Sequence, residues 1–278
     1  MKSNNTELVL ISDGIIKYDG GSMFGQVPKV LWEKMEAPDR RNRITLGMNC
    51  LLIQNGNQCV LVDTGAGTKE PEQIKDRHGL GSSQLPRELR SRGLTPRDIT
   101  TVILTHLHFD HCGGSTRLDR SGVAIPTFPT ATYYVQRVAW EEAMSPNERA
   151  KPSYHSDDFL PLEQRGQVCL LDGDAEVAPG IRVRVTGGHS RGHQMVLVHY
   201  GGERVAFFGD IIPTRHHLGL PYIASLDQFP EDTLDVKRAL LEEAERRGWL
   251  LVFSHGFGER TGYLERRNGD WNFRPVDM

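Results

Sequence analysis

The chain has 278 residues, of which 38% are hydrophobic and 25% charged, and its formal net charge is -3 at pH 7. No apolar run approaches the roughly 20 residues that cross a bilayer, and the composition is not that of a fibrous protein, so both classes are excluded. The small net charge gives no electrostatic attraction to nucleic acid or to a membrane surface, and we expect neither as a partner.

The N-terminal residues contain only a four-residue apolar run and no small-residue cleavage site, so no secretory signal is expected. The four cysteines (Cys50, Cys59, Cys112 and Cys169) lack Cys-x-x-Cys spacing. We therefore expect free thiols in a cytoplasmic protein.

Short apolar runs rich in Val, Ile and Phe, separated by Gly, Pro and Asp, predict β-strands along the chain. In chain order they cover residues 50–53, 59–62, 101–105, 132–135, 168–171, 181–185, 195–200, 205–208 and 249–253. The dipeptides Asn55-Gly56 and Asn268-Gly269 each stand between two apolar runs and predict hairpin turns.

Helical periodicity predicts helices at 85–92, which Gly93 ends, around 135–144, and most clearly at 231–247. Interleaved strands and helices indicate an α/β or α+β sandwich in which helices cover the sheets. No predicted strand is followed by GxGxxG or GxxxxGK(S/T), the two glycine motifs that bind phosphate groups. This argues against a dinucleotide-binding fold. We expect a single domain over residues 1–278.

Histidines and aspartates stand at the ends of four of the predicted strands. The strand at 101–105 leads into His106, His108, Asp110 and His111, and the other three lead to His189, Asp210 and His255. His106 and His108 point to the same side of an extended backbone, whereas Asp110 and His111 lie where the chain turns and can serve a second metal. Imidazole and carboxylate together suit zinc, iron, manganese or cobalt. Taken singly, Asp210 could cap a turn and His255 could be an interior histidine.

The motifs HLHFDH, GGHSRGH, FFGD and FSHG, preceded by VDTG at residues 62–65, resemble the metallo-β-lactamase superfamily in type and order. The resemblance implies an α+β four-layer αββα sandwich. It implies that His106, His108 and His189 bind one metal, that Asp110, His111 and His255 bind the other, and that Asp210 bridges the two. It also implies that Asp63 orients a ligand by hydrogen bonds, and that His193 supports the site without binding metal.

Two divalent ions sharing a carboxylate would provide a metal-bridging hydroxide at neutral pH, so hydrolysis is the expected chemistry, with Asp110 and Asp210 as its catalytic carboxylates. Zinc is the first choice, with iron or manganese as alternatives. Two features, Asp210 rather than a cysteine at the bridging position and Asp110 within HxHxDH, resemble lactonases, esterases and organophosphate hydrolases more than true β-lactamases. We therefore expect a small ester or lactone substrate, with promiscuous phosphotriesterase activity as an addition.

Pro213 stands where quorum-quenching lactonases often carry a tyrosine that contacts the substrate. Two segments without clear periodicity, at about 19–46 and 144–162, are expected to form the pocket walls. The candidate pocket residues are Phe24, Trp32, Tyr154, His216, His217 and Tyr222. The alternative role of these segments is a satellite core or a contact in a homodimer.

Three other functions stay open from the sequence. An iron-dependent sulfur dioxygenase uses fewer ligands at one metal, and a glyoxalase II-like thioesterase carries a helical C-terminal domain. A non-catalytic binding module on the same fold is the third.

Overall fold

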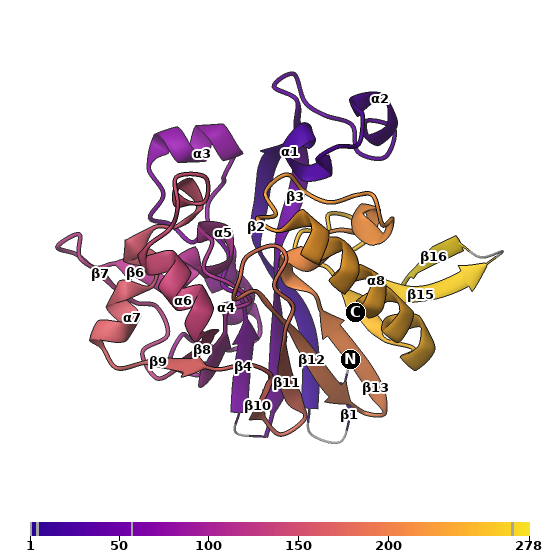
Figure 1. Ribbon diagram of the computed structural model, residues 1–278. Coiled ribbons are helices and arrows are strands. Elements are labelled where there is room, and N and C mark those ends of the chain that lie inside the picture. The colour runs from indigo at the N-terminus through magenta and orange to yellow at the C-terminus, as the bar shows by residue number, and fades with distance from the viewer. Residues whose placement is uncertain (1, 4–5, 57, 268–269) are drawn as a thin grey trace.

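In the computed structural model, which describes residues 2–3, 6–56, 58–267 and 270–278, two seven-stranded sheets face one another (Figure 1). The first sheet runs in the order β1 (Lys2–Ser3), β2 (Thr6–Asp19), β3 (Arg43–Asn55), β4 (Gln58–Val62), β5 (Thr101–Ile103), β8 (Thr132–Gln136) and β9 (Val168–Leu171). Its last three pairings, from β4 through β5 and β8 to β9, are parallel.

The second sheet is built from the C-terminal half of the chain. Its order is β10 (Ala175–Ala178), β11 (Ile181–Val185), β12 (Gln194–Tyr200), β13 (Glu203–Phe207), β14 (Leu250–Val252), β15 (Thr261–Arg267) and β16 (Asp270–Pro275). Only the β13–β14 pairing is parallel in this order. A separate small hairpin joins β6 (Thr116–Leu118) to β7 (Ala124–Pro126).

Eight α-helices occur in the described residues. They are α1 (Gly20–Phe24), α2 (Lys29–Trp32), α3 (Glu72–His78), α4 (Leu85–Ser91), α5 (Phe109–Cys112), α6 (Arg137–Met144), α7 (Leu160–Gln164) and α8 (Pro230–Arg247). None of the helices within this part of the chain is long and apolar enough to cross a membrane.

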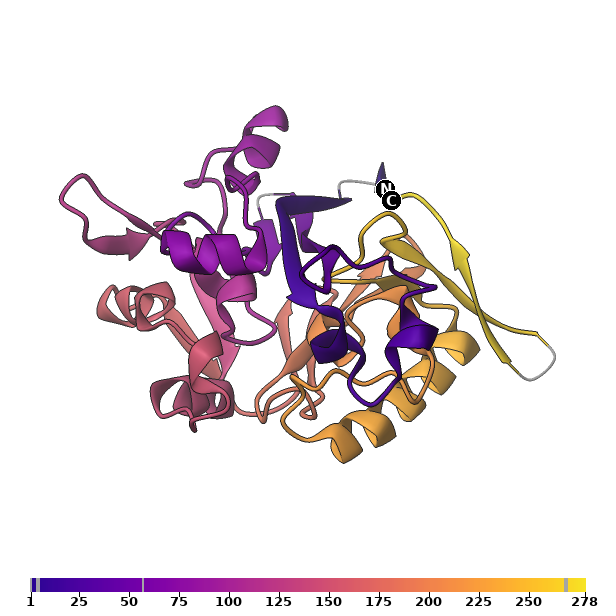
Figure 2. The same ribbon diagram turned by 90° about the horizontal axis from the view of Figure 1, so that it is seen from above.

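Alternating side chains create three apolar layers. In β3, Leu51 and Ile53 enter the core between the sheets, whereas Leu52 faces the outer core under α4, α6 and α7. In β13, Phe207 faces the inner core and Ala206 the core under α8. Figure 2 shows the two sheets back to back, with the pink helices α6 and α7 outside one and the orange α8 outside the other. The predicted αββα sandwich is confirmed.

The long strand β2 was not expected from the sequence. Its apolar pattern is broken at Gly14 (φ 123°), where the register with β3 shifts between Ser12 and Ile15. Such a bulge hides a 14-residue strand from a search for strict alternation. The helix expected around 135 begins instead at Arg137, because Val135 and Gln136 continue β8.

The hairpin turns have two outcomes. At the first, Asn55 pairs with Gln58, and Gly56 takes the positive φ of 57° that such a turn requires. The dipeptide Asn268-Gly269 lies outside the described residues, but β15 and β16 on either side of it pair antiparallel.

The 144–162 segment is fastened to the first half of the chain by a buried ion pair. Lys69 Nζ lies 2.9 Å from Asp158 Oδ1, and the two side chains are 6% and 0% exposed. The same ammonium donates to the carbonyl oxygens of Gly113 and Thr116. Burial raises the pKa of Asp158 to about 6, and the Lys69 ammonium opposes this rise because it stabilises the ionised carboxylate.

Replacing Lys69 by methionine should lower the free energy of unfolding by about 3 to 5 kcal/mol, because Asp158 is left buried without its cation. Urea unfolding of the metal-loaded protein measures this loss. The double variant Lys69→Met with Asp158→Leu should recover most of the stability. Lys75→Met, which breaks the more exposed pair with Glu72, is the matched control and should cost less than about 1 kcal/mol. An equal loss in both single variants would contradict the assignment.

Candidate metal centre

The carboxyl ends of strands from both sheets meet at one edge of the sandwich. β4 and β5 are parallel neighbours in the first sheet, and β11, β13 and β14 run in a common direction in the second. Gln194 joins the sheets there, since its backbone N–H donates to Thr105 O and its side chain donates to Leu104 O. Asn49 does the same through two side-chain bonds to Phe253 O and Gly256 O. The loops that leave these strand ends therefore start from fixed positions relative to one another.

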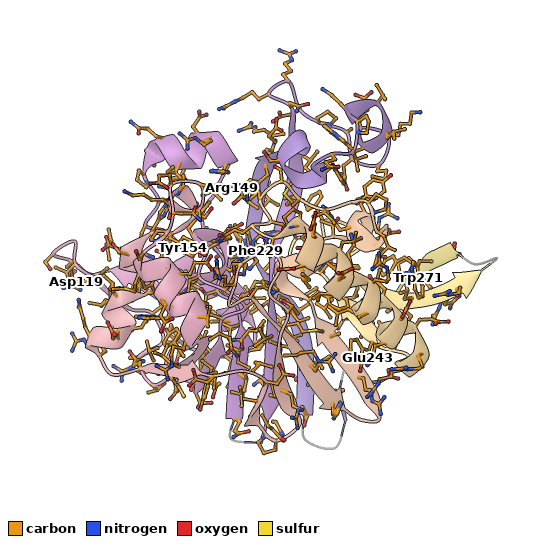
Figure 3. All side chains as sticks on the ribbon, viewed as in Figure 1. Asp119, Arg149, Tyr154, Phe229, Glu243 and Trp271 are labelled. Atoms are coloured by element: carbon orange, nitrogen blue, oxygen red, sulfur yellow. The ribbon has the colours of Figure 1, made fainter. Side chains whose placement is uncertain are left out.

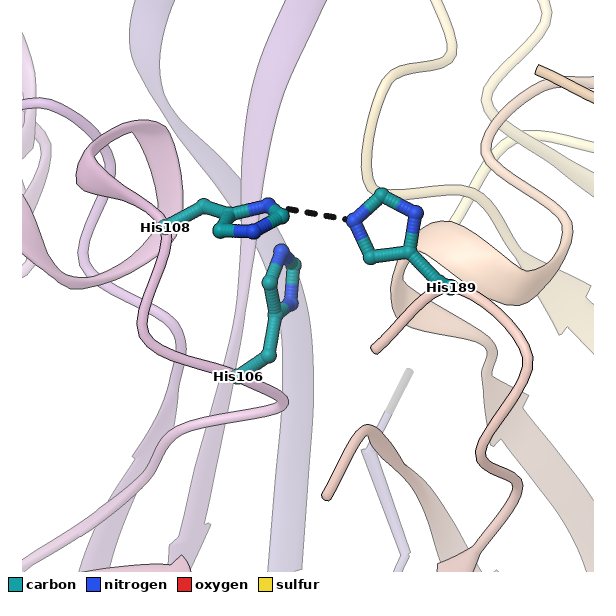
Figure 4. A group of neighbouring side chains, drawn as sticks. All are labelled: His106, His108 and His189. Atoms are coloured by element: carbon teal, nitrogen blue, oxygen red, sulfur yellow. Dashed lines mark hydrogen bonds between the residues drawn. The ribbon is translucent and has the colours of Figure 1, made fainter. Parts of the chain in front are cut away.

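Three imidazoles form the first group of donors. His106, His108 and His189 each offer one ligand atom, and these atoms all lie within 4.8 Å of one another. His189 Nε2 is 3.1 Å from His108 Nδ1, and His106 points into the gap between them (Figure 4). His106 Nε2 is buried without a hydrogen-bond partner. All three side chains are largely buried, so water does not satisfy these nitrogens.

The second group combines two imidazoles and a carboxylate: Asp110, His111 and His255. His111 Nε2 and His255 Nε2 are 3.1 Å apart, and Asp110 Oδ2 lies 3.6 Å from His255 Nε2. Asp110 and His111 belong to the one-turn helix α5, which places them beside the preceding extended histidines.

Asp210 lies between the two groups. Its Oδ1 is 3.2 Å from His111 Nε2 and 3.3 Å from His255 Nε2, whereas its Oδ2 is 3.6 Å from His189 Nε2. One carboxylate therefore faces both groups, with one oxygen toward each.

In His111, His189 and His255 the outward nitrogen binds a protein acceptor, which fixes the inward nitrogen as a lone-pair donor. His111 Nδ1 donates to Asp63 Oδ2 at 2.8 Å, His189 Nδ1 to Asp227 Oδ1 at 2.8 Å, and His255 Nδ1 to Gly47 O at 2.8 Å. Asp63 also accepts from the Thr105 N–H and hydroxyl, and its backbone holds a positive φ of 56°.

His193 contacts the protein through both ring nitrogens. Its Nε2 accepts from the Asp210 N–H at 2.9 Å, and its Nδ1 lies 2.5 Å from Thr186 Oγ1. Gly209, with a φ of 58°, lets the ring approach, since a Cβ there would lie 2.6 Å from His193 Nε2. His193 thus holds the backbone of Asp210.

Burial controls the protonation of the first group. It holds the pKa of His106 well below its ordinary value and lowers the pKa of His108 to about 3, so both rings are neutral donors at pH 7. Burial alone would raise the pKa of Asp210, but the imidazoles of His111 and His255 hold it well below its usual range. The carboxylate is therefore ionised.

These donors fit divalent cations. Two imidazole nitrogens at 3.1 Å need a cation or a proton between them, because their lone pairs would otherwise repel, and both groups contain two nitrogens at this distance. His and Asp donors without thiolate are the set that zinc, iron and manganese accept.

The predicted wall segments contribute unequally. Tyr154 packs edge-on against His108, with ring centroids 4.9 Å apart, and so lies at the centre. Figure 3 labels Arg149 on the same segment as Tyr154. Its guanidinium donates to Asp227 O at 3.1 Å. Phe24 and Trp32 stack on each other and are 0% and 1% exposed, so they form a buried support.

The three remaining pocket candidates, His216, His217 and Tyr222, differ in their surroundings. Both ring nitrogens of His217 are bonded, to Thr214 Oγ1 and Met23 O, and the ring is buried. His216 Nε2 pairs with Glu36 Oε1 at 3.2 Å. Tyr222 lines a groove of about 900 Å³ between residues 25–31 and 220–234.

Two residues at the centre were missed from the sequence. Asp227 stands alone in a loop, with no spacing that relates it to His189. Tyr18 ends the unrecognised strand β2, and its hydroxyl donates to Asp110 Oδ2 at 3.0 Å. Only recognition of β2 as a strand that ends at this edge could have pointed to Tyr18.

Comparisons with known proteins agree with this geometry. Residues 45–255 match the family model of the metallo-beta-lactamase superfamily. The N-acyl homoserine lactonase AttM of Azorhizobium caulinodans is 34% identical over 194 residues, which are 64% of this chain and 68% of that protein. An N-acyl homoserine lactonase of Bacillus thuringiensis is 30% identical over 56% of this chain, and the match spans 59% of that relative's length.

Two solved structures extend the similarity. A probable metal-dependent hydrolase from Staphylococcus aureus superposes with a TM-score of 0.90 at 29% identity, over 100% of both chains. The dizinc quorum-quenching lactonase AidC superposes with a TM-score of 0.82 at 18% identity, over 100% of this chain and 97% of its own, and so shares the fold.

Replacing Asp63 by asparagine should weaken metal binding about 10- to 100-fold, because His111 loses the charged acceptor that orients it. Asparagine tolerates the positive φ at this position, so the fold should persist. Metal content after equilibration with a competing chelator measures the change, and Asp98→Asn on the surface is the matched control. Unchanged metal retention in Asp63→Asn would refute this role.

Proposed function

Because the chain belongs to the metallo-beta-lactamase superfamily, we propose that it is a dinuclear-metal hydrolase of carboxylic esters or lactones. The observation that carries the proposal is the position of Asp210, with one oxygen toward His111 and His255 and the other toward His189. A shared carboxylate is what holds two divalent ions close enough to act on one substrate.

We propose zinc as the metal, with iron and manganese compatible with the same donors. His106, His108 and His189 would hold one ion, Asp110, His111 and His255 the other, and Asp210 both. Two such ions supply a hydroxide nucleophile at neutral pH and polarise the carbonyl oxygen that it attacks.

The protein's own residues keep this set in place. Asp63, Asp227 and Gly47 O hold the outward nitrogens, so the rings do not turn away when substrate enters. His193 holds the backbone of Asp210, and Ser254 Oγ donates to Asp210 Oδ1 at 3.0 Å. These contacts preorganise the donors, which reduces the reorganisation that catalysis would otherwise require.

A neutral lactone is the substrate class we propose. The curated relatives named above are N-acyl homoserine lactonases, and Tyr154 and Phe109 give the surroundings of the donors an apolar character. Phosphotriesters offer a phosphoryl oxygen to the same ions, so we propose a slower activity on them. The seven-donor set favours two ions over the single ion of a sulfur dioxygenase. The free thiols of Cys50, Cys59 and Cys112 support a cytoplasmic location.

Removing the metal should abolish hydrolysis, and adding zinc should restore it. The zinc-loaded protein should contain two ions per chain by elemental analysis. It should hydrolyse an N-acyl homoserine lactone and an aryl ester. Full metallation without activity on either substrate would count against the hydrolase. One iron per chain with oxygen uptake would favour the dioxygenase.

Asp210→Asn should reduce kcat/KM about a thousandfold, because the amide cannot serve both donor groups as a carboxylate does. Asp232→Asn, on the first turn of α8, is the matched control and should behave as the wild type. Activity of Asp210→Asn within tenfold of the wild type would remove Asp210 from the proposed chemistry.

A further inference from the structure

A phenolic hydroxyl reaches the metal centre from the N-terminal strand. Tyr18 is the penultimate residue of β2, and its hydroxyl donates to Asp110 Oδ2 at 3.0 Å. That oxygen also faces His255 Nε2 at 3.6 Å. Tyr18 is only partly buried, in contrast to the donors around it. Its hydroxyl is buried beside the second donor group.

The backbone and the ring of Tyr18 are both held by neighbours. Its backbone pairs with Ile44 in β3, and its ring packs edge-on against His78, with centroids 4.8 Å apart. His78 in turn contacts Phe109, next to Asp110, at 5.5 Å. Because the ring is held by neighbours, the hydroxyl has one main freedom, rotation of its hydrogen about the C–O bond. It can turn from Asp110 to another acceptor without moving the ring.

The residues after Asp210 offer no comparable donor. Ile211, Ile212 and Pro213 carry no side-chain hydroxyl or N–H. The next polar side chain, Thr214, binds His217 Nδ1 with its hydroxyl, and the His217 ring is bonded on its other side to Met23 O. His216 Nε2 faces Glu36. Among these and Tyr18, only Tyr18 directs a neutral donor at a member of the donor set.

We propose that Tyr18 donates a hydrogen bond to the carbonyl oxygen of the substrate during hydrolysis, an inference that rests on the proposed lactone or ester hydrolase. When hydroxide adds to the carbonyl carbon, the π electron pair of C=O moves onto oxygen, and the Tyr18 O–H stabilises that oxyanion without transferring its proton. When the carbonyl reforms, the C–O bond to the leaving oxygen breaks with its electron pair, and that oxygen takes up the proton of the added hydroxide, so the products are a carboxylate and an alcohol. The hydrogen of Tyr18 then returns to Asp110.

The test is Tyr18→Phe, which removes the hydroxyl and keeps the ring that packs on His78. Loss of one oxyanion donor should lower kcat about 100-fold on a lactone, with KM changed less than threefold and two metal ions still bound. Tyr263→Phe is the matched control, because Tyr263 Oη bonds Glu203 on the second sheet, and it should leave both constants unchanged.

Aryl esters with activated leaving groups provide the second measurement. A donor to the carbonyl oxygen acts before the leaving group departs, so Tyr18→Phe should lose a similar factor on aryl esters and on lactones. A loss confined to lactones would overturn the carbonyl assignment in favour of the leaving alkoxide.

Three further results separate the possibilities. A Tyr18→Phe variant as active as the wild type would overturn the role of Tyr18 and leave the proposed function intact. A kcat that falls only in proportion to lost metal would also overturn it, because Tyr18 would then merely position Asp110. Wild-type protein inactive on all substrates would overturn the proposed function itself.

Discussion

Mutual repulsion among buried electron-rich atoms is the constraint on which the rest of this structure depends. Seven donors converge on one edge of the sandwich, and two pairs of imidazole nitrogens face each other at 3.1 Å. Left to themselves, such groups would turn away or take up protons. Three of the rings, those of His111, His189 and His255, stay because Asp63, Asp227 and Gly47 O hold them on the outer side.

The contact between the two sheets fixes the loops that carry the donors and their acceptors. Gln194 and Asn49 bond across the sandwich at the edge where the strands end, so the loops of both halves start from fixed points. His255 comes from the second sheet, yet its ring is held by Gly47 of the first. The close packing of Val, Ile and Leu between the sheets is thus connected directly to the orientation of single imidazoles.

Local patterns in the sequence predicted the strands that end at the site and the motifs that follow them. The apolar runs of β5, β11, β13 and β14 end shortly before the candidate metal ligands, and the order of these motifs identified the superfamily and the αββα fold. Asp227 and Tyr18 escaped, because each owes its place to tertiary contacts that leave no spacing in the chain. The bulge at Gly14 hid β2, and with it the route by which Tyr18 reaches Asp110. The structure also shows, as the sequence cannot, that both ring nitrogens of His217 are bonded.

The division of the donors between the two sheets has a consequence for the folding equilibrium. His106, His108, Asp110 and His111 follow the first sheet, and His189, Asp210 and His255 the second. A cation held by both sets recognises only the assembled native state, so its binding free energy adds to the free energy of unfolding. Each tenfold rise in free metal above the dissociation constant contributes about 1.4 kcal/mol at one site. With metal bound, the stability of this protein would rise with the supply of metal, quite apart from any reaction that it catalyses.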